Sequence, residues 1–275
     1  MFILFFDSDD EKEEEEKKIT VGVFVGRFQP LTKAHLTSII HFLEKFDIVL
    51  VLIGSHGLPE FNEQNGIPVN PKNPYNTIIR RQMLEKALDD VIQEKNMDPE
   101  ILKKMLFYGI HDSNHESGYK KDMSDFSKWN SDFHKIVMDG INTFYMPQSF
   151  NTWKSFSDNF TVYLCGSKKD DSTGTYLDKI TNGFKKVGDE KEVIPVNYDG
   201  NPYLQNYFIP PILTEEGGSQ TIDATFIRQL ISEINQADKD LDWETVEEKM
   251  EELKKWVPET TIEVLQSHKK LAEIK

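Results

Sequence analysis

The chain has 275 residues with a formal net charge of −15 at pH 7, and 29% of its residues are charged. This length accommodates one large α/β domain with appendages or two small domains, with enough residues to bury a core. The negative charge argues against a general nucleic-acid-binding protein, although a local group of Arg, Lys and His could still bind a nucleotide. The single cysteine, Cys165, excludes an intramolecular disulfide, and no apolar run reaches the length of a membrane span. We therefore expect a cytoplasmic protein that associates with neither nucleic acid nor membrane.

Residues 21–53 predict a βαβ unit. A β-branched and aromatic run at 21–25 predicts a buried strand, and Gly26 ends it where a tight turn must allow close approach of the backbone. Apolar residues then recur at helical spacing from position 36 to 43, and 48–53 is a second apolar strand. A strand, a helix and a strand over this length predict parallel strands joined by a right-handed crossover.

The later part of the chain continues this alternation of helices and strands. Asn76 or Thr77 can cap a helix, whose buried side we expect to carry Ile78, Ile79, Met83, Leu84, Ala87, Leu88 and Val91. Apolar runs predict further strands at 105–110, 160–166 and 192–198, and an edge element at 209–213. The pattern is typical of a Rossmann-like α/β fold, an open parallel sheet with helices on both faces.

Composition divides the chain into three regions. Residues 1–18 are an acidic N-terminal tail, 19–236 form the α/β domain, and 237–275 are a charged C-terminal helical segment that either packs on the domain or mediates self-association. Residues 111–159 lack clear periodicity and predict an insertion with a helix around 126–138. Its aromatic residues either form a small core or include one or two rings that stack on a base: Trp129, Phe133, Phe144, Tyr145, Trp153 and Phe156.

Two loops and one helix start are candidate ligand sites. The loop after Gly26 and the turn at 54–57 both follow parallel strands, so they should be neighbours at the edge of the sheet where ligands bind. Thr225 and Arg228 lie three residues apart at the start of a predicted helix, and therefore on one face of it. The first turn of a helix also has unpaired N–H groups and the positive end of the helix dipole. Together with Thr225 and Arg228, these groups favour binding of a triphosphate.

The loop carries a longer motif. Gly26-Arg27-Phe28-Gln29-Pro30, followed by Thr32-x-x-His35, resembles the (H/T)-x-G-H signature of the nucleotidyltransferase superfamily, in the form found in the nicotinamide-mononucleotide (NMN) adenylyltransferase branch. Three later segments resemble elements of the same enzymes: Asn73-Pro74-Tyr75 with Arg80, Ser167-Lys168-Lys169-Asp170-Asp171-Ser172, and Asp223-Ala224-Thr225-x-x-Arg228.

The resemblance implies an adenylyltransferase that joins NMN to the AMP moiety of ATP, giving NAD and pyrophosphate. Whether it also accepts nicotinate mononucleotide depends on how it contacts the amide of NMN or the carboxylate of that analogue. The phosphate oxygen of NMN would attack the α-phosphorus of ATP directly, a reaction that needs positioning and charge stabilisation more than a side-chain nucleophile. Mg²⁺ would be held mainly by the substrate phosphates and water, so the resemblance implies no protein metal site.

The same resemblance implies the roles of individual residues. The catalytic residues would be His35, Thr32 and Arg228. ATP and its phosphates would be bound by Gly26, Arg27, Phe28, Gln29, Thr225, Arg80, Lys168 and Lys169. Weaker substrate contacts would come from Ser55, Asn73 and Asp170. Arg80 would lie near the nucleotide phosphates or pack the binding loop.

Two departures from the family pattern keep alternatives open. Thr32 and Ala34 stand where this branch usually has His and Gly. One alternative is a related transferase acting on phosphopantetheine or flavin mononucleotide, against which the GRFQP run argues. The other is a non-catalytic nucleotide sensor, against which the joint presence of His35, Thr225 and Arg228 argues. A homo-oligomer is compatible with either function.

Overall fold

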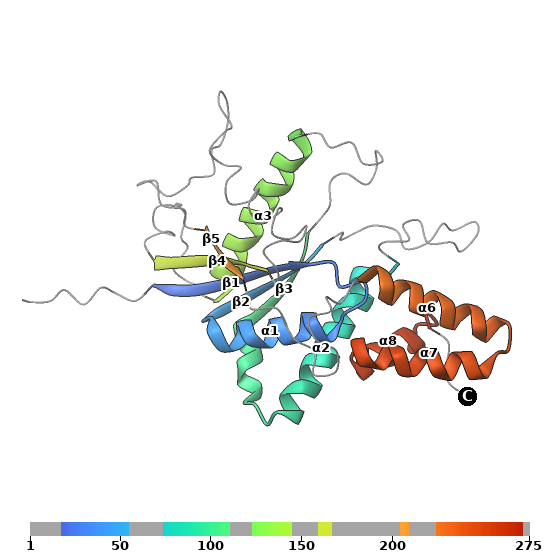
Figure 1. The fold of residues 1–275 in the computed structure, drawn as a ribbon. Helices are drawn as coiled ribbons and strands as arrows, with labels where there is room; N and C mark the ends of the chain where they lie inside the picture. The colour runs from blue at the N-terminus through green and yellow to red at the C-terminus, as the bar shows by residue number, and fades with distance from the viewer. Residues whose placement is uncertain are drawn as a thin grey trace, which may run out of the picture.

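The core of the protein is a five-stranded parallel sheet. The structure, a computed structural model, describes residues 18–54, 74–110, 123–144, 159–166, 204–208 and 224–271. The sheet has the strand order β3-β2-β1-β4-β5, and all neighbouring strands are parallel (Figure 1). The strands are β1 Ile19–Gly26, β2 Ile48–Ile53, β3 Met105–Gly109, β4 Phe160–Gly166 and β5 Leu204–Phe208. This order reverses direction between β1 and β4, which makes the carboxyl ends of those strands the topological switch point of a Rossmann-like fold.

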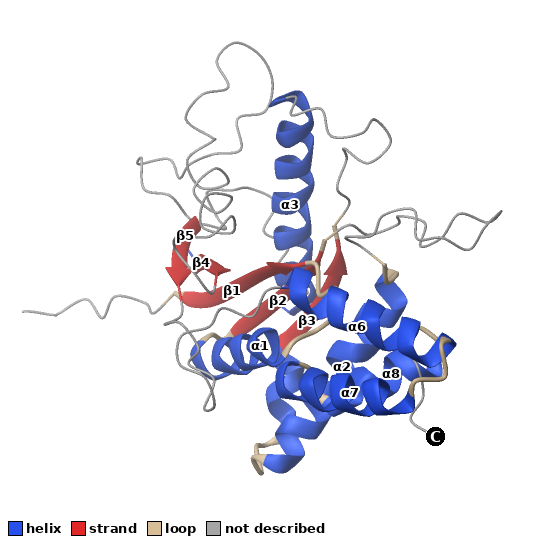
Figure 2. Ribbon diagram, turned by 45° about the vertical axis from the view of Figure 1, so that its right-hand side comes forward, coloured by secondary structure: helices blue, strands red, loops and turns tan. Residues whose placement is uncertain are grey.

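Helices cover both faces of the sheet, as predicted. Alternate residues of β2 point to opposite faces: Val49, Val51 and Ile53 pack against the α1 (Lys33–Lys45) and α2 (Thr77–Glu94) side. The remaining β2 residues pack against α3 (Met123–Phe144) on the other face (Figure 2). Gly140 lets α3 approach β2 closely, because a Cβ at that position would lie 2.9 Å from a methyl carbon of Leu50. A short 3₁₀ helix, η1, spans Pro99–Lys104.

The periodic segments of the sequence match most of these elements. β2 and β4 have the predicted bounds, and α3 extends the helix expected at 126–138 in both directions. Phe133, one of the candidate base-stacking aromatics, is fully buried in the sheet core. The remaining insertion aromatics, except Phe144, fall where the structure does not describe the side chain. Phe144 also packs against that core.

Two features differ from prediction. Ile78, which the sequence predicts on the buried side of its helix, is 68% exposed. The buried face of α2 runs through Ile79, Met83 and Ala87, and Ile78 lies about 100° around the helix from Ile79. Residues 204–208 form β5, a strand that the apolar pattern did not predict. The strand predicted at 192–198 and the edge element at 209–213 lie outside the described residues.

The C-terminal helices pack on the domain. They are α6 (Ala224–Lys239), α7 (Trp243–Trp256) and α8 (Glu259–Ser267). α7 packs along α6 and α8 packs on α2, and their buried residues belong to the same apolar cluster as α1 and one face of the sheet. The boundary predicted after residue 236 therefore falls within α6. Whether the segment also mediates self-association stays a prediction.

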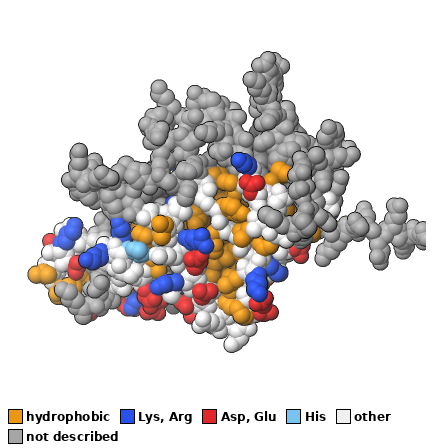
Figure 3. Space-filling view, turned by 180° about the vertical axis from the view of Figure 1, so that it is seen from behind, with side chains coloured by type: hydrophobic (Ala, Val, Ile, Leu, Met, Phe, Trp, Pro, Cys, Tyr) orange, Lys and Arg blue, Asp and Glu red, His pale blue; other side chains and the backbone are white. Residues whose placement is uncertain are grey.

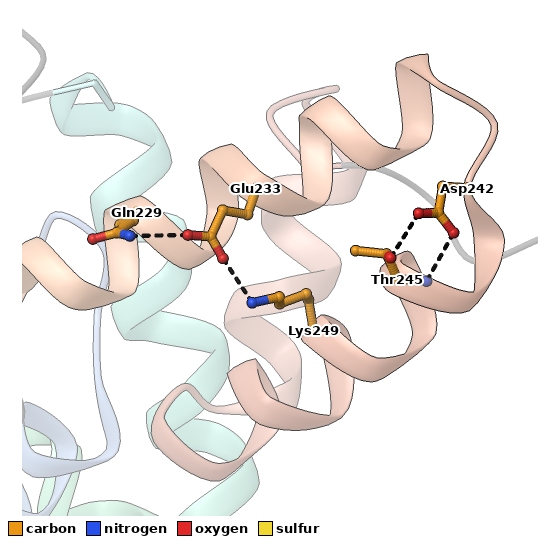
Figure 4. Close-up of polar contacts among 5 residues, drawn as sticks. All are labelled: Gln229, Glu233, Asp242, Thr245 and Lys249. Atoms are coloured by element: carbon orange, nitrogen blue, oxygen red, sulfur yellow. Dashed lines mark hydrogen bonds and ion pairs between the residues drawn. The ribbon is translucent and has the colours of Figure 1, made fainter.

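Polar contacts at the surface support the α6–α7 pair. Glu233 of α6 pairs with Lys249 of α7 at 2.8 Å and also accepts a hydrogen bond from Gln229 (Figure 4). These partners lower the pKa of the Glu233 carboxyl, and the pairing raises that of Lys249. Asp242 caps α7 by accepting from the backbone and the hydroxyl of Thr245.

The surface carries charges of both signs. On the face shown in Figure 3, Lys and Arg side chains of the described residues are interspersed with Asp and Glu rather than gathered into one patch. Within the described part of the chain, no helix combines the length and apolar character needed to cross a bilayer.

Candidate active site

Three segments that are distant in sequence meet at the switch point. The first is residues 26–35, which connect β1 to the first turn of α1 and include the GRFQP loop (residues 26–30). The second is residues 74–80, which lead into α2, and the third is the first turn of α6, residues 224–228. Gly54, directly after β2, donates from its backbone N–H to the Gly26 carbonyl at 2.9 Å, so the first residue of the 54–57 turn lies beside the loop after Gly26. The rest of that turn lies outside the described residues.

The Phe28 side chain belongs to the core. Its backbone has a φ of 49°, and its ring is buried edge-to-face against Phe24 and His35, with ring centroids 5.8 and 5.2 Å apart. A Cβ at Gly26 would lie 2.5 Å from this ring, so the turn requires glycine there. Phe28 therefore shapes the loop from beneath, whereas the resemblance implied a residue that binds ATP.

Gln29 clamps the loop to the segment before α2. Its side-chain amide donates to the Tyr75 carbonyl at 2.8 Å, and its side-chain oxygen accepts from the Tyr75 N–H at 2.9 Å. Gln29 is 2% exposed, so both polar ends of the amide are engaged inside the protein. We call this pair of bonds the Gln29 clamp. It holds the Gln29 side chain against protein main chain instead of presenting it to a ligand.

We expect Gln29→Glu to destabilise the protein by about 2–4 kcal/mol. The substitution keeps the shape of the side chain but replaces the donor to the Tyr75 carbonyl with an oxygen, and it buries a carboxylic acid. Urea unfolding at pH 7.5 would measure the effect. Gln93→Glu, an exposed position on α2, is the matched control and should change stability by less than about 0.5 kcal/mol. Equal stability of the two variants would contradict the clamp.

Arg80 connects the GRFQP loop to the residue that follows β2. Its guanidinium is 1% exposed and donates to the main-chain carbonyls of Arg27 and Gly54. It also donates to the Asn76 carbonyl at 3.3 Å and to the Thr77 hydroxyl at 3.2 Å. Of the two placements that the resemblance allowed, these bonds correspond to packing of the binding loop.

Thr32 and His35 form a capping box at the start of α1. The His35 N–H donates to the Thr32 hydroxyl at 3.4 Å, and the Thr32 N–H donates to His35 Nδ1 at 3.2 Å. The Thr32 hydroxyl also lies 2.8 Å from Nδ1. Thr32 is 2% exposed, whereas His35 is half-buried. Burial lowers the pKa of His35 from 6.5 to about 4, so its imidazole is neutral at physiological pH.

The lowered pKa of His35 predicts a pH-dependent stability. Between pH 6.5 and 4 the unfolded chain binds a proton at this position and the folded protein does not, so the free energy of unfolding falls as the pH falls. From pH 7.5 to pH 5 we expect a loss of about 2 kcal/mol from this group. Urea unfolding of the wild type and of His35→Gln at both pH values measures the contribution of His35 to this loss. The carboxylates titrate alike in both proteins, so their contribution cancels in the comparison. A His35→Gln variant that loses as much stability as the wild type would contradict this assignment.

Arg228 brings α6 to the GRFQP loop. Its guanidinium donates to the Gln29 carbonyl at 3.1 Å and to the hydroxyl of Thr225, on the same helix face, at 3.3 Å. Burial raises the pKa of the Tyr75 phenol above its usual value, and the nearby Arg228 charge opposes that shift. Thr225 is exposed and Arg228 is half-buried, so both can reach a ligand above the loop.

The resulting site is electropositive. The exposed Arg27 and the partly exposed Arg228 lie beside the starts of α1 and α6, whose N–H groups and dipoles favour anions. His35 adds a neutral donor on the first turn of α1. The described residues of the site contain no carboxylate, and no group of three His, Cys, Asp or Glu side chains in the described ranges could hold a metal ion. This arrangement can bind the phosphates of a nucleotide.

Several predicted site residues lie outside the described residues: Ser55, Asn73, Lys168, Lys169 and Asp170. Sequence reasoning did not identify Tyr75 and Gly54 as anchoring positions. Both contribute main-chain groups, and a main-chain group leaves no signal in residue type.

The chain matches proteins that transfer nucleotidyl groups. It is 36% identical over 69 residues to a nicotinamide-nucleotide adenylyltransferase of Thermococcus sibiricus, and 37% identical over 73 residues to that of Pyrococcus furiosus. Each match covers 25% of this chain and 32% of the relative, so the chain spans about a third of the length of the curated relatives it matches.

Two of the solved structures that resemble this chain come from Francisella tularensis and Plasmodium falciparum. A bifunctional NMN adenylyltransferase/ADP ribose pyrophosphatase from Francisella tularensis is 19% identical, with a TM-score of 0.45, over 79% of this chain and 43% of that one. The nicotinic acid mononucleotide adenylyltransferase of Plasmodium falciparum is 13% identical, with a TM-score of 0.40, over 91% and 96%. The cytidylyltransferase-like family model matches residues 23–171, which begin within β1, include the GRFQP loop and extend past the end of β4. This match covers more than half of the residues, and the chain belongs to the cytidylyltransferase-like family.

Proposed function

We propose that the protein is an adenylyltransferase that joins NMN to the AMP moiety of ATP, giving NAD and pyrophosphate. The observation that carries this proposal is the hydrogen bond from Arg228 to the Gln29 carbonyl. It unites the two motif-bearing segments, 199 residues apart, in one electropositive site at the switch point of the sheet. The partial matches to nicotinamide-nucleotide adenylyltransferases support the same choice of substrates. We propose residues 19–236 as the catalytic region.

In the proposed reaction an oxygen of the NMN phosphate attacks the α-phosphorus of ATP. One P–O bond forms as the bond to the pyrophosphate leaving group breaks, without a covalent enzyme intermediate. The protein supplies geometry and charge stabilisation. His35 would donate to an α- or β-phosphate oxygen, and Arg27 and Arg228 would neutralise the triphosphate. Thr225 and the N–H groups of the first α6 turn would hold the leaving pyrophosphate.

A divalent cation, Mg²⁺ in our proposal, fits this site as a partner of the substrate. A Francisella tularensis structure of similar fold is a complex with AMP and a manganese ion. The described residues around the loop are cations and N–H donors, which bind phosphate and not metal. The cation would therefore be held by phosphate oxygens and water, and it would supply further neutralisation of the triphosphate.

A turnover assay tests the proposal. Purified protein is incubated with ATP, Mg²⁺ and either NMN or nicotinate mononucleotide, and pyrophosphate and dinucleotide are quantified together. We expect equal amounts of both products, in a reaction that stops when ATP is omitted. Comparing the two mononucleotides gives the preference between amide and carboxylate. Absence of dinucleotide with either, despite measurable ATP binding, would overturn the proposal; phosphopantetheine and flavin mononucleotide would then be tested as acceptors.

A further inference from the structure

The surroundings of His35 Nδ1 determine where the ring carries its proton. The Thr32 backbone N–H lies 3.2 Å from Nδ1, and a backbone N–H can only donate. Nδ1 must therefore be the acceptor, because a proton on it would oppose the Thr32 N–H directly. In a neutral imidazole the single proton then resides on Nε2.

The hydrogen-bond partners of the Thr32 hydroxyl also fix its orientation. Its oxygen accepts the His35 N–H at 3.4 Å through a lone pair, which leaves its own hydrogen available to donate to Nδ1 at 2.8 Å. A hydroxyl is suited to this position because it can accept and donate at once. The Thr32 side chain is thus engaged on both sides, and at 2% exposure it faces the protein interior.

Packing fixes the plane of the His35 ring. Phe28 lies edge-to-face with it at 5.2 Å between centroids, and Phe24 is tilted against it at 6.4 Å. Burial also keeps the ring neutral by lowering its pKa to about 4. With Nδ1 turned toward Thr32 and the ring packed against Phe28, Nε2 is the atom left to act as a donor.

We propose that Thr32 is a positioning residue that fixes His35 as the Nε2–H tautomer, rather than a residue that contacts the substrate. This changes the role implied by the family resemblance, in which Thr32 is itself a catalytic residue. The tautomer is a property of the free protein. Delivery of the Nε2–H to a phosphate oxygen rests on the proposed function.

Nitrogen NMR of the free protein tests the tautomer without any substrate. In ¹⁵N-labelled protein, two-bond ¹H–¹⁵N correlations report which ring nitrogen is protonated, and His35→Gln assigns the His35 signals. We expect a protonated Nε2 and an unprotonated Nδ1 at pH 7.5. A protonated Nδ1, or averaged shifts from two exchanging tautomers, would overturn the proposal whether or not the protein synthesises a dinucleotide.

Two variants of Thr32 separate positioning from packing. Thr32→Ser keeps the hydroxyl and should preserve both the spectrum and the kinetics. Thr32→Val keeps the shape and the backbone N–H but removes the hydroxyl that donates to Nδ1 at 2.8 Å, so the Nδ1 resonance should shift and the preference for the Nε2–H tautomer should weaken. In the adenylyltransferase assay, kcat for Thr32→Val should fall about 10-fold while KM for ATP stays within about 2-fold. An unchanged spectrum in Thr32→Val would overturn the role of the hydroxyl. A KM for ATP that rises with kcat unchanged would instead indicate a direct substrate contact, which also contradicts the proposal.

Discussion

His35→Ala is expected to lower the rate of dinucleotide formation about 100- to 1,000-fold, the usual effect of removing one donor to charge that develops in a transition state. His35 is the neutral donor of the site and lies on the first turn of α1, whereas the exposed Arg27 and the partly exposed Arg228 supply its positive charge. The loss should fall on kcat, because Arg27 and Arg228 would still bind the triphosphate in the ground state. Steady-state kinetics with ATP varied at saturating NMN would measure it.

His41→Ala is the control for this variant. His41 lies on the same helix and hydrogen-bonds Tyr207 at 2.8 Å, away from the GRFQP loop. We expect its removal to leave kcat within about 3-fold of the wild type, because it contacts none of the three site segments. If His35→Ala and His41→Ala were equally active, His35 would have no part in the transition state. An active wild type is required for this comparison, so it follows the turnover assay.

Arg80→Met should be the most destabilising single substitution at the site, with a loss of about 3–5 kcal/mol in the free energy of unfolding. The Arg80 guanidinium donates to two loop carbonyls and to the first turn of its own helix. Methionine fills much of the same volume but cannot donate to the buried carbonyls of Arg27 and Gly54. Urea unfolding monitored by circular dichroism would give the loss.

Arg81 provides a matched control one position along the helix. Its side chain is 57% exposed and pairs with Glu85 at 2.7 Å, and exposed pairs of this kind contribute little. We expect Arg81→Met to cost less than about 1 kcal/mol. Arg80→Lys should lie between the two, because an ammonium retains the charge but not the planar arrangement of donors. A cost for Arg80→Met as small as that for Arg81→Met would contradict the anchoring role.

Much of the fold follows from short-range patterns. Consecutive apolar residues predict β2 and β4 because parallel strands covered on both faces are apolar throughout. β5 has the sequence LQNYF, and its polar residues interrupt the apolar run by which a buried strand is predicted. Ile78 and Ile79 are adjacent apolar residues of one helix, and periodicity alone could not choose which of them faces the sheet. The strand order depends on contacts between distant segments, and it comes from the structure.

The candidate site, like the fold, is predicted from the sequence only in part. The motif letters identify which segments converge, but they do not reveal which side chains face the ligand. Phe28, Gln29, Thr32 and Arg80 are all nearly fully buried and contact the protein itself. His35, Arg27, Arg228 and Thr225 remain at least partly exposed. A polar residue in a loop has the same sequence signature in both roles, because the distinction depends on acceptors supplied by main chain elsewhere in the fold.

The main-chain acceptors of the site have a consequence for its mutational tolerance. Arg80 and the Gln29 clamp recognise carbonyl groups of Arg27, Gly54 and Tyr75, and every amino acid supplies such a carbonyl. Substitutions at the positions that supply these carbonyls therefore leave the hydrogen bonds intact, whereas substitutions of Arg80 or Gln29 break them. Diverging copies of this protein could vary the side chain at Arg27, and with it the charge that meets the ligand, without losing the scaffold that holds the loop.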